Sequence, residues 1–379
     1  MNGSTRKRGN TWTAYWFTTD PSTGQRVQHT KGGFRLQKEA RDHLNDVLGK
    51  VSTGTWNPDK PLTVKALLED HWLPAQKARE LRPTTLEQYR NVVDAWIVPN
   101  IGGVKAAALT PKIVGGMVET LRTAKSSRGR KGLSTRSAQL AVGVLKSACA
   151  WAVENGLMGR NPIAGIRRPR SKSTVMASWD SAQAKAFLAF TKDDRLAFVW
   201  SLLLTRGLRR GELCGLRWSD VDLEGGVVRI NRTRVTVKGQ PTDSAPKTEA
   251  SRRTVPVDPS LVAILRTHKA RQAAEKLAAG TAYDDKGYLL ADELGSPCHP
   301  ETLSGWFEEK VEAAGLPRIR LHDTRHTAAS LMLARGVPVK VVSEMLGHSS
   351  PTITLSIYAH VMPGMAEEAG AALSASLLS

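Results

Sequence analysis

The chain has 379 residues, of which 41% are hydrophobic and 23% are charged, a globular composition that predicts two or three domains at roughly 100 to 200 residues per domain. Its 54 Lys and Arg residues outnumber 35 Asp and Glu residues, and the resulting net charge of +19 favours a polyanionic partner such as nucleic acid. The longest mainly apolar stretch, residues 196–204, is far shorter than the roughly 20 residues of a membrane-spanning helix, and three cysteines without a CxxC motif indicate neither a disulfide framework nor a cysteine zinc site.

Residues 1–60 predict a small sheet packed on a helix. The basic run Arg6 to Arg8 is followed by polar residues instead of the apolar core of a signal peptide, so we expect a cytoplasmic protein. Strands are predicted at 12–17 and 26–30, joined by a turn at 20–24, and a helix is predicted at 37–51. The aromatic residues Trp12, Tyr15, Trp16 and Phe34 are interpreted as core in preference to base-stacking groups.

Residues 61–172 carry 19 basic and 7 acidic residues, the largest surplus of the three segments, and this predicts a basic domain surface. Helices are predicted at 64–76, 83–96, 111–123 and 134–155, with Thr84 and Thr110 as N-caps. The loop at 125–131 contains four cations, Lys125, Arg128, Arg130 and Lys131. A phosphate contact and a merely solvated loop are about equally expected for these cations.

Residues 173–379 are nearly neutral, with 25 basic and 23 acidic residues, so a site here would use individually placed cations. Four stretches are dense in groups suited to phosphate chemistry. They are residues 205–213 after an apolar helix, 246–249 in a turn between strands around 229–238 and 253–257, 322–327 at the start of a helix, and 346–350, which is followed by Tyr358.

Transfer of a DNA phosphodiester without a metal requires a nucleophile, cations for the two non-bridging oxygens and a proton donor for the leaving alkoxide. A tyrosine can attack phosphorus and conserve the bond energy as a phosphotyrosine ester. Two arginines provide permanently charged, forked donors, and a lysine or histidine can supply the proton. These four stretches contain all of these groups, so neither ATP nor a metal ion is needed and no cofactor is expected.

At these residues the sequence resembles the tyrosine recombinase, or phage integrase, family. The family signature, in order, is Arg, Lys, His-x-x-Arg, His or Trp, and Tyr, and it matches Arg209, Lys247, His322, Arg325, His348 and Tyr358. Lys238 competes with Lys247, which is preferred because Lys-Thr precedes a strand as in the family. Thr324, where the family often has leucine, is a departure within the motif.

The resemblance implies a role for each matched residue. Tyr358 would be the nucleophile that forms a 3′-phosphotyrosine, and Arg209 and Arg325 would hold the non-bridging oxygens. His348 would add a hydrogen bond, Lys247 would protonate the departing 5′-oxygen, and His322 would assist proton transfer.

Supporting roles are expected for four neighbours, Glu212, Asp323, His326 and His360. Glu212 and Asp323 are interpreted as orienting carboxylates near Arg209 and His322, with helix capping an equal alternative for Asp323. A zinc-protease helix is a weaker alternative for the pair His322 and His326, because Asp323 stands where that motif has Glu and no further ligand pattern follows.

The resemblance also implies an α+β multidomain fold. The predicted domains are 1–60, an arm-type DNA-binding domain with a small β-sheet plus helix; 61–172, an all-α core-binding domain; and 173–379, a mainly α catalytic domain with a small antiparallel sheet. The implied partners are double-stranded DNA with core and arm attachment sites, a homotetramer on DNA, an excisionase and a DNA-bending host factor, in the nucleoid of a bacterial host cell. The tail at 365–379 is interpreted as a helix that docks on a neighbouring protomer or packs on its own chain.

We therefore expect a site-specific recombinase of a phage or integrative element that performs integration and excision. A type IB topoisomerase shares the covalent chemistry, although the arm-type domain speaks against it. A non-catalytic DNA-binding protein on the same scaffold would explain the charge but would not need all six matched residues.

Overall fold

The computed structural model describes residues 3–19, 24–52, 62–124, 132–167, 177–245 and 251–358, together with residues 374, 375, 377 and 378. These residues form two compact units, Met1–Ser173 and Thr174–Ser379. Six of the predicted site residues lie outside the described residues: Lys125, Arg128, Arg130, Lys131, Lys247 and His360. Of Tyr358, the structure describes the backbone.

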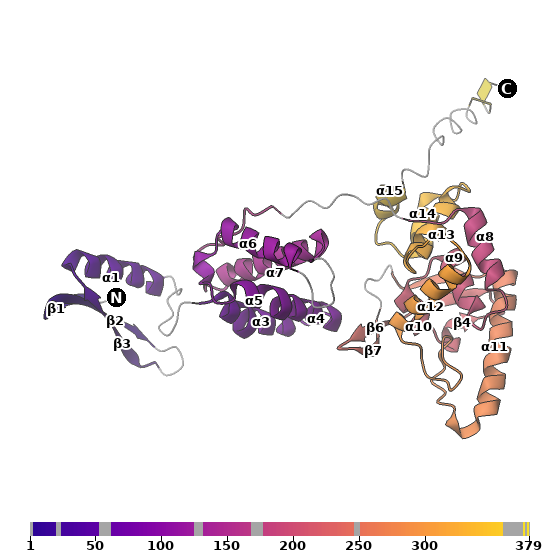
Figure 1. Ribbon diagram of the computed structural model, residues 1–379, viewed down its shortest axis with the longest axis horizontal. Coiled ribbons are helices and arrows are strands. Elements are labelled where there is room, and N and C mark those ends of the chain that lie inside the picture. The colour runs from indigo at the N-terminus through magenta and orange to yellow at the C-terminus, as the bar shows by residue number, and fades with distance from the viewer. Residues whose placement is uncertain are drawn as a thin grey trace. The chain divides into compact units, whose positions relative to one another are not determined.

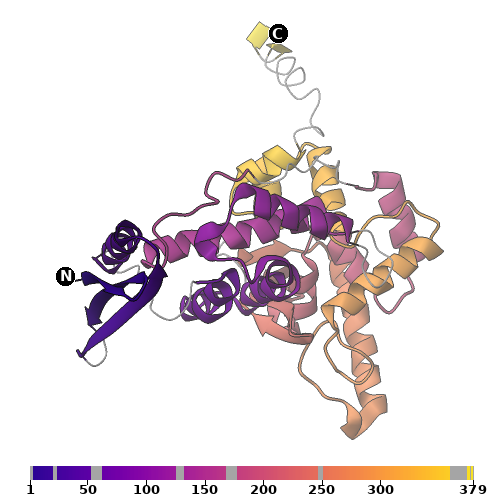
Figure 2. The same ribbon diagram turned by 60° about the vertical axis from the view of Figure 1, so that its left-hand side comes forward.

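The N-terminal part is a three-stranded antiparallel sheet in the order β1-β2-β3 with helix α1 along one face (Figures 1 and 2). Its elements are β1 (Gly3–Arg8), β2 (Thr11–Thr19), β3 (Arg26–Phe34) and α1 (Gln37–Ser52). Strands β1 and β2 are joined at the pair Arg8 and Thr11, and Gly9 in this turn has φ +59°, a conformation that glycine adopts without penalty.

Strand β1 was absent from the sequence prediction. Its residues are polar and mostly exposed, so they lack the alternation of apolar and polar side chains that identifies a half-buried strand. A short, charged strand at a sheet edge is a common way to prevent further strand pairing. The basic run Arg6 to Arg8 therefore belongs to an edge strand.

The core between this sheet and α1 contains Ala14 and Trp16 from β2 and Leu44 and Val47 from α1, with Phe34 packed against them. The prediction of a core position is thus correct for Trp16 and Phe34. Because successive strand residues point to opposite faces, Tyr15 lies on the face away from α1, although it is also buried.

Residues 62–167 form short helices around an apolar core. The elements are α2 (Val64–Ala66), the π-helical turn η1 (Leu67–Trp72), α3 (Leu73–Ala78), α4 (Pro83–Val92), the π-helical turn η2 (Val93–Ile97), α5 (Val98–Ile101), η3 (Ala106–Ala108), α6 (Pro111–Thr123) and α7 (Thr135–Glu154). The core is built largely from aliphatic residues with Trp72 and Met117. The four predicted helices are present, the first two with a π-helical turn inside them.

Of the two predicted helix caps, one is correct. The Thr110 hydroxyl accepts a hydrogen bond from the Ile113 amide at 3.3 Å and caps α6. The Thr84 cap was wrong: α4 begins at Pro83 and its N-cap is Arg82. Proline needs no hydrogen-bond partner for its backbone nitrogen and is well suited to the first helical position, so Thr84 lies inside the helix.

The C-terminal unit combines helices with a small sheet. Its helical elements are α8 (Ser181–Phe190), α9 (Ala197–Arg206), α10 (Arg210–Gly215), η4 (Trp218–Asp220), α11 (Pro259–Ala279), η6 (Gly280–Ala282), α12 (Pro300–Ala313), α13 (Asp323–Leu333), α14 (Val339–Leu346) and α15 (Pro351–Tyr358). Its strands are β4 (Val221–Asp222), β5 (Val227–Ile230), β6 (Thr233–Val237), β7 (Gln240–Ser244) and β8 (Arg253–Pro256). The sheet has the order β4-β5-β8, and β6 and β7 form a separate hairpin, so the single strand predicted at 229–238 is in fact two strands.

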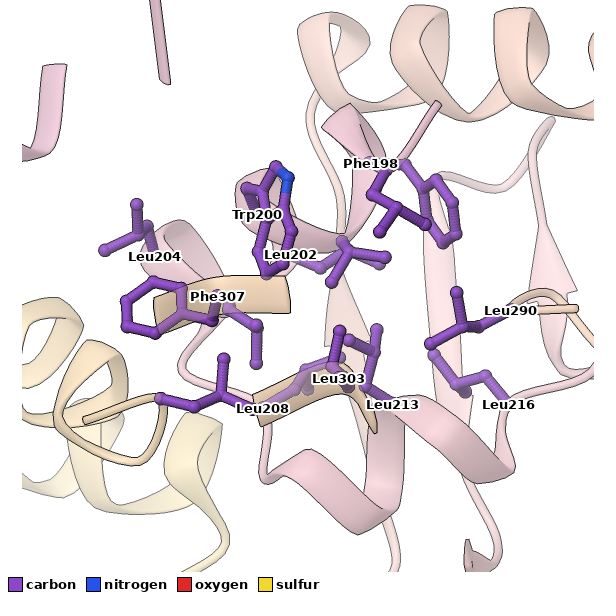
Figure 3. Close-up of a cluster of buried hydrophobic side chains, with 14 of the residues drawn as sticks. Phe198, Trp200, Leu202, Leu204, Leu208, Leu213, Leu216, Leu290, Leu303 and Phe307 are labelled. Carbon is purple, nitrogen blue, oxygen red and sulfur yellow. The ribbon is translucent and has the colours of Figure 1, made fainter. Parts of the chain in front are cut away.

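Helix α9 runs through the core of this unit. Its residues from Phe198 to Leu204 are all buried, and Phe198, Trp200, Leu202 and Leu204 pack among side chains such as Phe307 (Figure 3). A helix that is apolar on every side is stable only when it is covered all round. The core therefore fixes the C-terminal end of α9, where the first of the motif stretches begins. No helix in the described ranges is both long and apolar enough to cross a membrane.

Candidate active site

A glycine ends α9 and sets the direction of the first motif. Gly207 has φ +63° and ψ +33°, and a Cβ atom added there would lie 2.5 Å from Cδ2 of Leu346 and 3.4 Å from Cβ of Ala328. The left-handed conformation and the close packing both require glycine. The next residue, Leu208, is buried at 1% exposure and anchors the turn, so Arg209 emerges at a fixed position before α10.

The Arg209 guanidinium is held by two acceptors. Nη1 donates to Oε1 of Glu212 at 2.7 Å, and Nη2 donates to the carbonyl of Gly347 at 2.8 Å. The Arg209 amide also donates to Oε2 of Glu212 at 2.9 Å. The side chain of Arg209 remains 34% exposed, so it is oriented by the protein and still faces solvent.

Arg325 approaches the same turn from helix α13. It is only 3% exposed, and its Nη1 donates to the carbonyl of Gly207 at 2.8 Å. Arg325, which is far from Arg209 in the sequence, is therefore tied through Gly207 to the turn that ends at Arg209.

His348 follows Gly347, a left-handed residue that ends α14. The His348 amide donates to the Ser343 carbonyl at 3.0 Å, and Nδ1 of its ring lies 2.7 Å from the hydroxyl of the buried Thr354. Burial and the positive charges of Arg325 and Arg209 lower the pKa of His348 to about 4. The ring is therefore neutral at pH 7, with Nδ1 in a hydrogen bond to Thr354.

His322 lies directly before α13, and its exposed side chain packs edge-on against the ring of His326 at 5.3 Å between centroids. Loss of hydration beside protein atoms, followed by the charges of His326 and Arg325, lowers the pKa of His322 to about 4. Loss of hydration, with nearby positive charge as the second cause, thus keeps both motif histidines neutral at pH 7.

The supporting residues differ in how well they match expectation. Glu212 contacts Arg209 as expected. The carboxylate of Asp323, in contrast, accepts three hydrogen bonds from Arg320. The amide and Nε of Arg320 donate at 2.9 Å, and Nη2 of Arg320 donates at 2.7 Å. The unusual Thr324 is buried, with its hydroxyl donating to the Leu321 carbonyl at 2.7 Å, so this departure from the motif is accommodated.

The structure describes Tyr358 as the last residue of α15, which packs against α14, the helix that precedes His348. Lys247 falls between β7 and β8, outside the described residues. Its competitor, Lys238, lies at the turn of the β6–β7 hairpin with φ +49°. The roles of all six motif residues remain predictions, and the side chains of Tyr358 and Lys247 lie outside what the structure describes.

Arg253 is a residue of this site that sequence reasoning missed. From β8, its Nη1 and Nη2 donate to Oε1 and Oε2 of Glu212 at 3.0 Å and 2.9 Å, and its Nε donates to the Met345 carbonyl at 2.7 Å. Nothing local in the sequence distinguishes this arginine from Arg252 beside it, which is exposed.

Among the described residues, no group of three or more His, Cys, Asp or Glu side chains is arranged to hold a metal ion.

A second candidate site is the face of the N-terminal sheet away from α1. The guanidinium of Arg6 lies 5.5 Å from the centre of the Tyr15 ring, and that of Arg26 lies 4.3 Å from the centre of the Phe17 ring. Aromatic rings stabilise cations above their faces. This face therefore carries two positive charges, each of which lies over an aromatic ring.

Two family models match the chain. The model of the phage integrase family matches residues 178–364, and that of an arm DNA-binding domain matches residues 4–51.

Two curated relatives align with part of the chain. A XerC-like tyrosine recombinase of Caldanaerobacter subterraneus subsp. tengcongensis is 35% identical over 252 residues, 62% of this chain and 64% of that protein. The ICEBs1 integrase of Bacillus subtilis is 26% identical over 239 residues, 62% of this chain and 65% of that protein. The chain thus spans just under two thirds of the length of these two relatives.

Two solved structures share the fold. The Tn1549 transposon integrase in complex with transposon right end DNA has a TM-score of 0.66 at 21% identity, covering 84% of this chain and 100% of that chain. A lambda integrase dimer bound to a COC′ core site has a TM-score of 0.57 at 18% identity, covering 93% of this chain and 94% of that chain. The predicted α+β fold is confirmed.

Proposed function

We propose that this chain, which belongs to the phage integrase family of tyrosine recombinases, is a site-specific recombinase that cuts and rejoins DNA for the integration and excision of a phage or integrative element. The observation that carries the proposal is the convergence of Arg209 and Arg325 on the turn at Gly207, with His348 beside them. Three donors from distant parts of the sequence are thereby brought to adjoining segments of the chain.

In the proposed reaction, the phenolic oxygen of Tyr358 attacks the scissile phosphorus. A bond from phosphorus to the tyrosine oxygen forms, the bond from phosphorus to the 5′-oxygen breaks, and the product is a 3′-phosphotyrosine with a free 5′-hydroxyl. Lys247 gives a proton to the departing oxygen, and His322 assists removal of the phenol proton. Attack by the 5′-hydroxyl of a partner strand reverses these steps and releases Tyr358.

Arg209 and Arg325 would stabilise the charge that builds on the non-bridging oxygens. An arginine has five N–H donors, and Arg209 uses two of its side-chain donors within the protein, which leaves three for a phosphate. His348 would donate from Nε2 in the tautomer whose Nδ1 accepts from the Thr354 hydroxyl. Donors that are already oriented require no reorganisation when the charge develops.

We also propose the partners of this reaction. DNA core sites would be bound by residues 61–172, the expected core-binding domain, and by the C-terminal unit. Arm sites would be bound at the sheet face that carries Arg6 and Arg26, with support from the arm DNA-binding match. A homotetramer on DNA is proposed by analogy with a lambda integrase tetramer bound to a Holliday junction, which shares the fold with a TM-score of 0.57. An excisionase, a DNA-bending host factor and a location at the nucleoid in the bacterial cytoplasm complete the proposal.

The test is covalent trapping on a nicked DNA substrate that carries the element's own attachment sequence, in the presence of EDTA. We expect the wild type and Tyr283→Phe, a tyrosine outside the site, to form a protein-DNA adduct that survives a denaturing gel, and Tyr358→Phe to form none. Binding without any adduct would favour the non-catalytic alternative. Relaxation of supercoiled DNA that lacks attachment sites would favour a type IB topoisomerase.

A further inference from the structure

We infer that Arg253 is a positioning residue for the proposed cleavage reaction, because it occupies the Glu212 carboxylate and thereby leaves Arg209 available to the phosphate. This inference rests on the proposed function. It starts from an asymmetry between two arginines that share one carboxylate. The Arg253 side chain is 7% exposed, whereas that of Arg209 is 34% exposed, so Arg253 is enclosed by protein while Arg209 faces the region where DNA would bind.

The carboxylate between them is almost completely buried, with Glu212 at 3% exposure. Burial alone would raise the pKa of Glu212, but the guanidinium of Arg253, followed by that of Arg209, holds this pKa below its ordinary value. Both oxygens are in use: Oε1 accepts from the two guanidiniums, and Oε2 accepts from Arg253 and from the Arg209 amide. The group formed by Arg209, Arg253 and Glu212 therefore contains two positive charges and one negative charge.

The two arginines bind the Glu212 carboxylate in different ways. Arg253 binds both oxygens of Glu212 through the two ends of its fork, an arrangement that fixes the plane of a carboxylate. Arg209 reaches only one of these oxygens with its side chain. Most of the negative charge of Glu212 is thus neutralised by Arg253, and the charge of Arg209 is left for a substrate.

Arg253 also holds the segment that carries the second acceptor of Arg209. Its Nε donates to the carbonyl of Met345, two residues before Gly347, whose carbonyl accepts from Arg209. His348 follows directly. A single side chain from β8 therefore links the carboxylate that orients Arg209 to the loop that carries His348.

Without Arg253, Glu212 would be a buried carboxylate with Arg209 as its only guanidinium partner. A buried charge that loses a partner draws more strongly on the one that remains, so Arg209 would turn toward Glu212 and away from the phosphate. We therefore expect Arg253→Gln to slow the chemical step about 10- to 100-fold, by analogy with the loss of a residue that orients a metal ligand. Affinity for DNA should change by less than about 2-fold, because an enclosed side chain makes no phosphate contact.

The experiment measures single-turnover adduct formation on saturating DNA with either a normal or a methylphosphonate scissile linkage. The methylphosphonate replaces one non-bridging oxygen by a methyl group and carries no charge, so it removes the need for neutralisation by Arg209. The variants are Arg253→Gln, Arg253→Lys, Arg209→Gln and the double variant Arg209→Gln/Arg253→Gln. Arg266→Gln, which breaks an exposed pair with Glu224, is the matched control.

The inference predicts that Arg253→Gln is slow on normal DNA and nearly as fast as the wild type on methylphosphonate DNA, as is Arg209→Gln. It also predicts that Arg253→Gln costs little additional rate once Arg209 has been replaced, since residues that act through one another are not additive. Arg253→Lys, which keeps the charge without the fork, should be intermediate and provides the comparison if the glutamine variant does not fold. Arg266→Gln should match the wild type on both substrates.

Equal losses on both substrates, or fully multiplicative losses in the double variant, would show that Arg253 only supports the fold and would overturn the inference. An unchanged rate for Arg253→Gln would do the same. Failure of the wild type to form any adduct would instead contradict the proposed function, so the two failures can be distinguished.

Discussion

The cations of the N-terminal sheet and those of the C-terminal unit are held in contrasting ways. Arg6 and Arg26 lie on aromatic rings at the surface of a small sheet, where their positions need only suit the backbone of a long polyanion. Arg209 and Arg325 are instead tied to individual carbonyl or carboxylate groups. Under the proposed function, cations of the first kind would bind the DNA backbone, whereas the hydrogen-bonded arginines would stabilise one reacting phosphate.

The largest effect that tests this difference between the two groups of cations is expected from removing a buried cation. Arg325→Ala should reduce the rate of adduct formation by about 10² to 10³, the usual cost of losing a donor to a developing oxyanion, with a much smaller effect on DNA affinity. Single-turnover cleavage on saturating DNA measures the rate, and Arg325→Lys tests whether charge without the fork suffices. A large loss of DNA affinity with an unchanged rate of adduct formation would show that Arg325 acts in binding, and would contradict this expectation.

The turn that positions both arginines can be tested with two glycines. Gly207→Ala would combine a left-handed conformation with a clash against Leu346 and should lower the free energy of unfolding by about 2–4 kcal/mol. Gly9→Ala, at φ +59° with open space around it, should cost only about 1–2 kcal/mol. Thermal or denaturant unfolding compares the two, and equal losses would contradict the packing argument.

The surface cations should behave as additive phosphate contacts. The variants Arg6→Gln and Arg26→Gln are each expected to weaken binding to arm-site DNA and to reduce the slope of log K against log salt by about 0.9 per lost contact. Cleavage of a substrate with a core site alone should be unaffected. The opposite result, normal arm binding with slow core cleavage, would remove the distinction between the two regions.

The pKa values of His322 and His348 are both about 4 in the free protein, and binding of a phosphate should change them. A phosphate beside these rings would raise both pKa values, so the complex would hold more protons than the free protein in mildly acidic solution. By linkage, affinity for core DNA should rise several-fold as the pH falls from about 7 to 5. Replacement of both histidines by glutamine should remove this rise, and a pH-independent affinity of the wild type would contradict it.

The free protein should show the opposite trend in stability. Because the pKa of each histidine is lower in the folded chain than its ordinary value near 6.5, the unfolded chain takes up protons more readily between about pH 6.5 and 4. The folded state therefore loses stability as the pH falls through this window. Melting temperatures measured from pH 7 to 4.5 test the sign, and the double glutamine variant should have a flatter profile.

Local patterns were sufficient to predict much of the fold. Helix α6 was predicted with its exact bounds and its Thr110 cap, because amphipathic spacing and a Thr-Pro start are local signals. Strand β1 was missed because its exposed residues carry no alternation. The carboxylate of Asp323 was expected either to orient His322 or to cap the helix, and in the structure it accepts hydrogen bonds from the amide and the guanidinium of Arg320.

Residues of the candidate active site could be predicted from the sequence only where they belong to the family motif. Arg209, His322, Arg325 and His348 stand out by their order and neighbours, and the structure brings them to adjoining segments. Arg253 could not be found in this way, since its partners Glu212 and Met345 lie 41 and 92 residues away in the sequence. A contact of that kind exists only once the chain has folded.

The most direct test of the central claim is to identify the residue that becomes attached to DNA. The wild-type adduct would be formed in EDTA on the nicked attachment-site substrate, digested with nuclease and protease, and analysed by mass spectrometry. The account predicts a single phosphotyrosine ester in the peptide that contains Tyr358. Attachment through a serine or another tyrosine, or no attachment to cognate DNA that is fully bound, would contradict it.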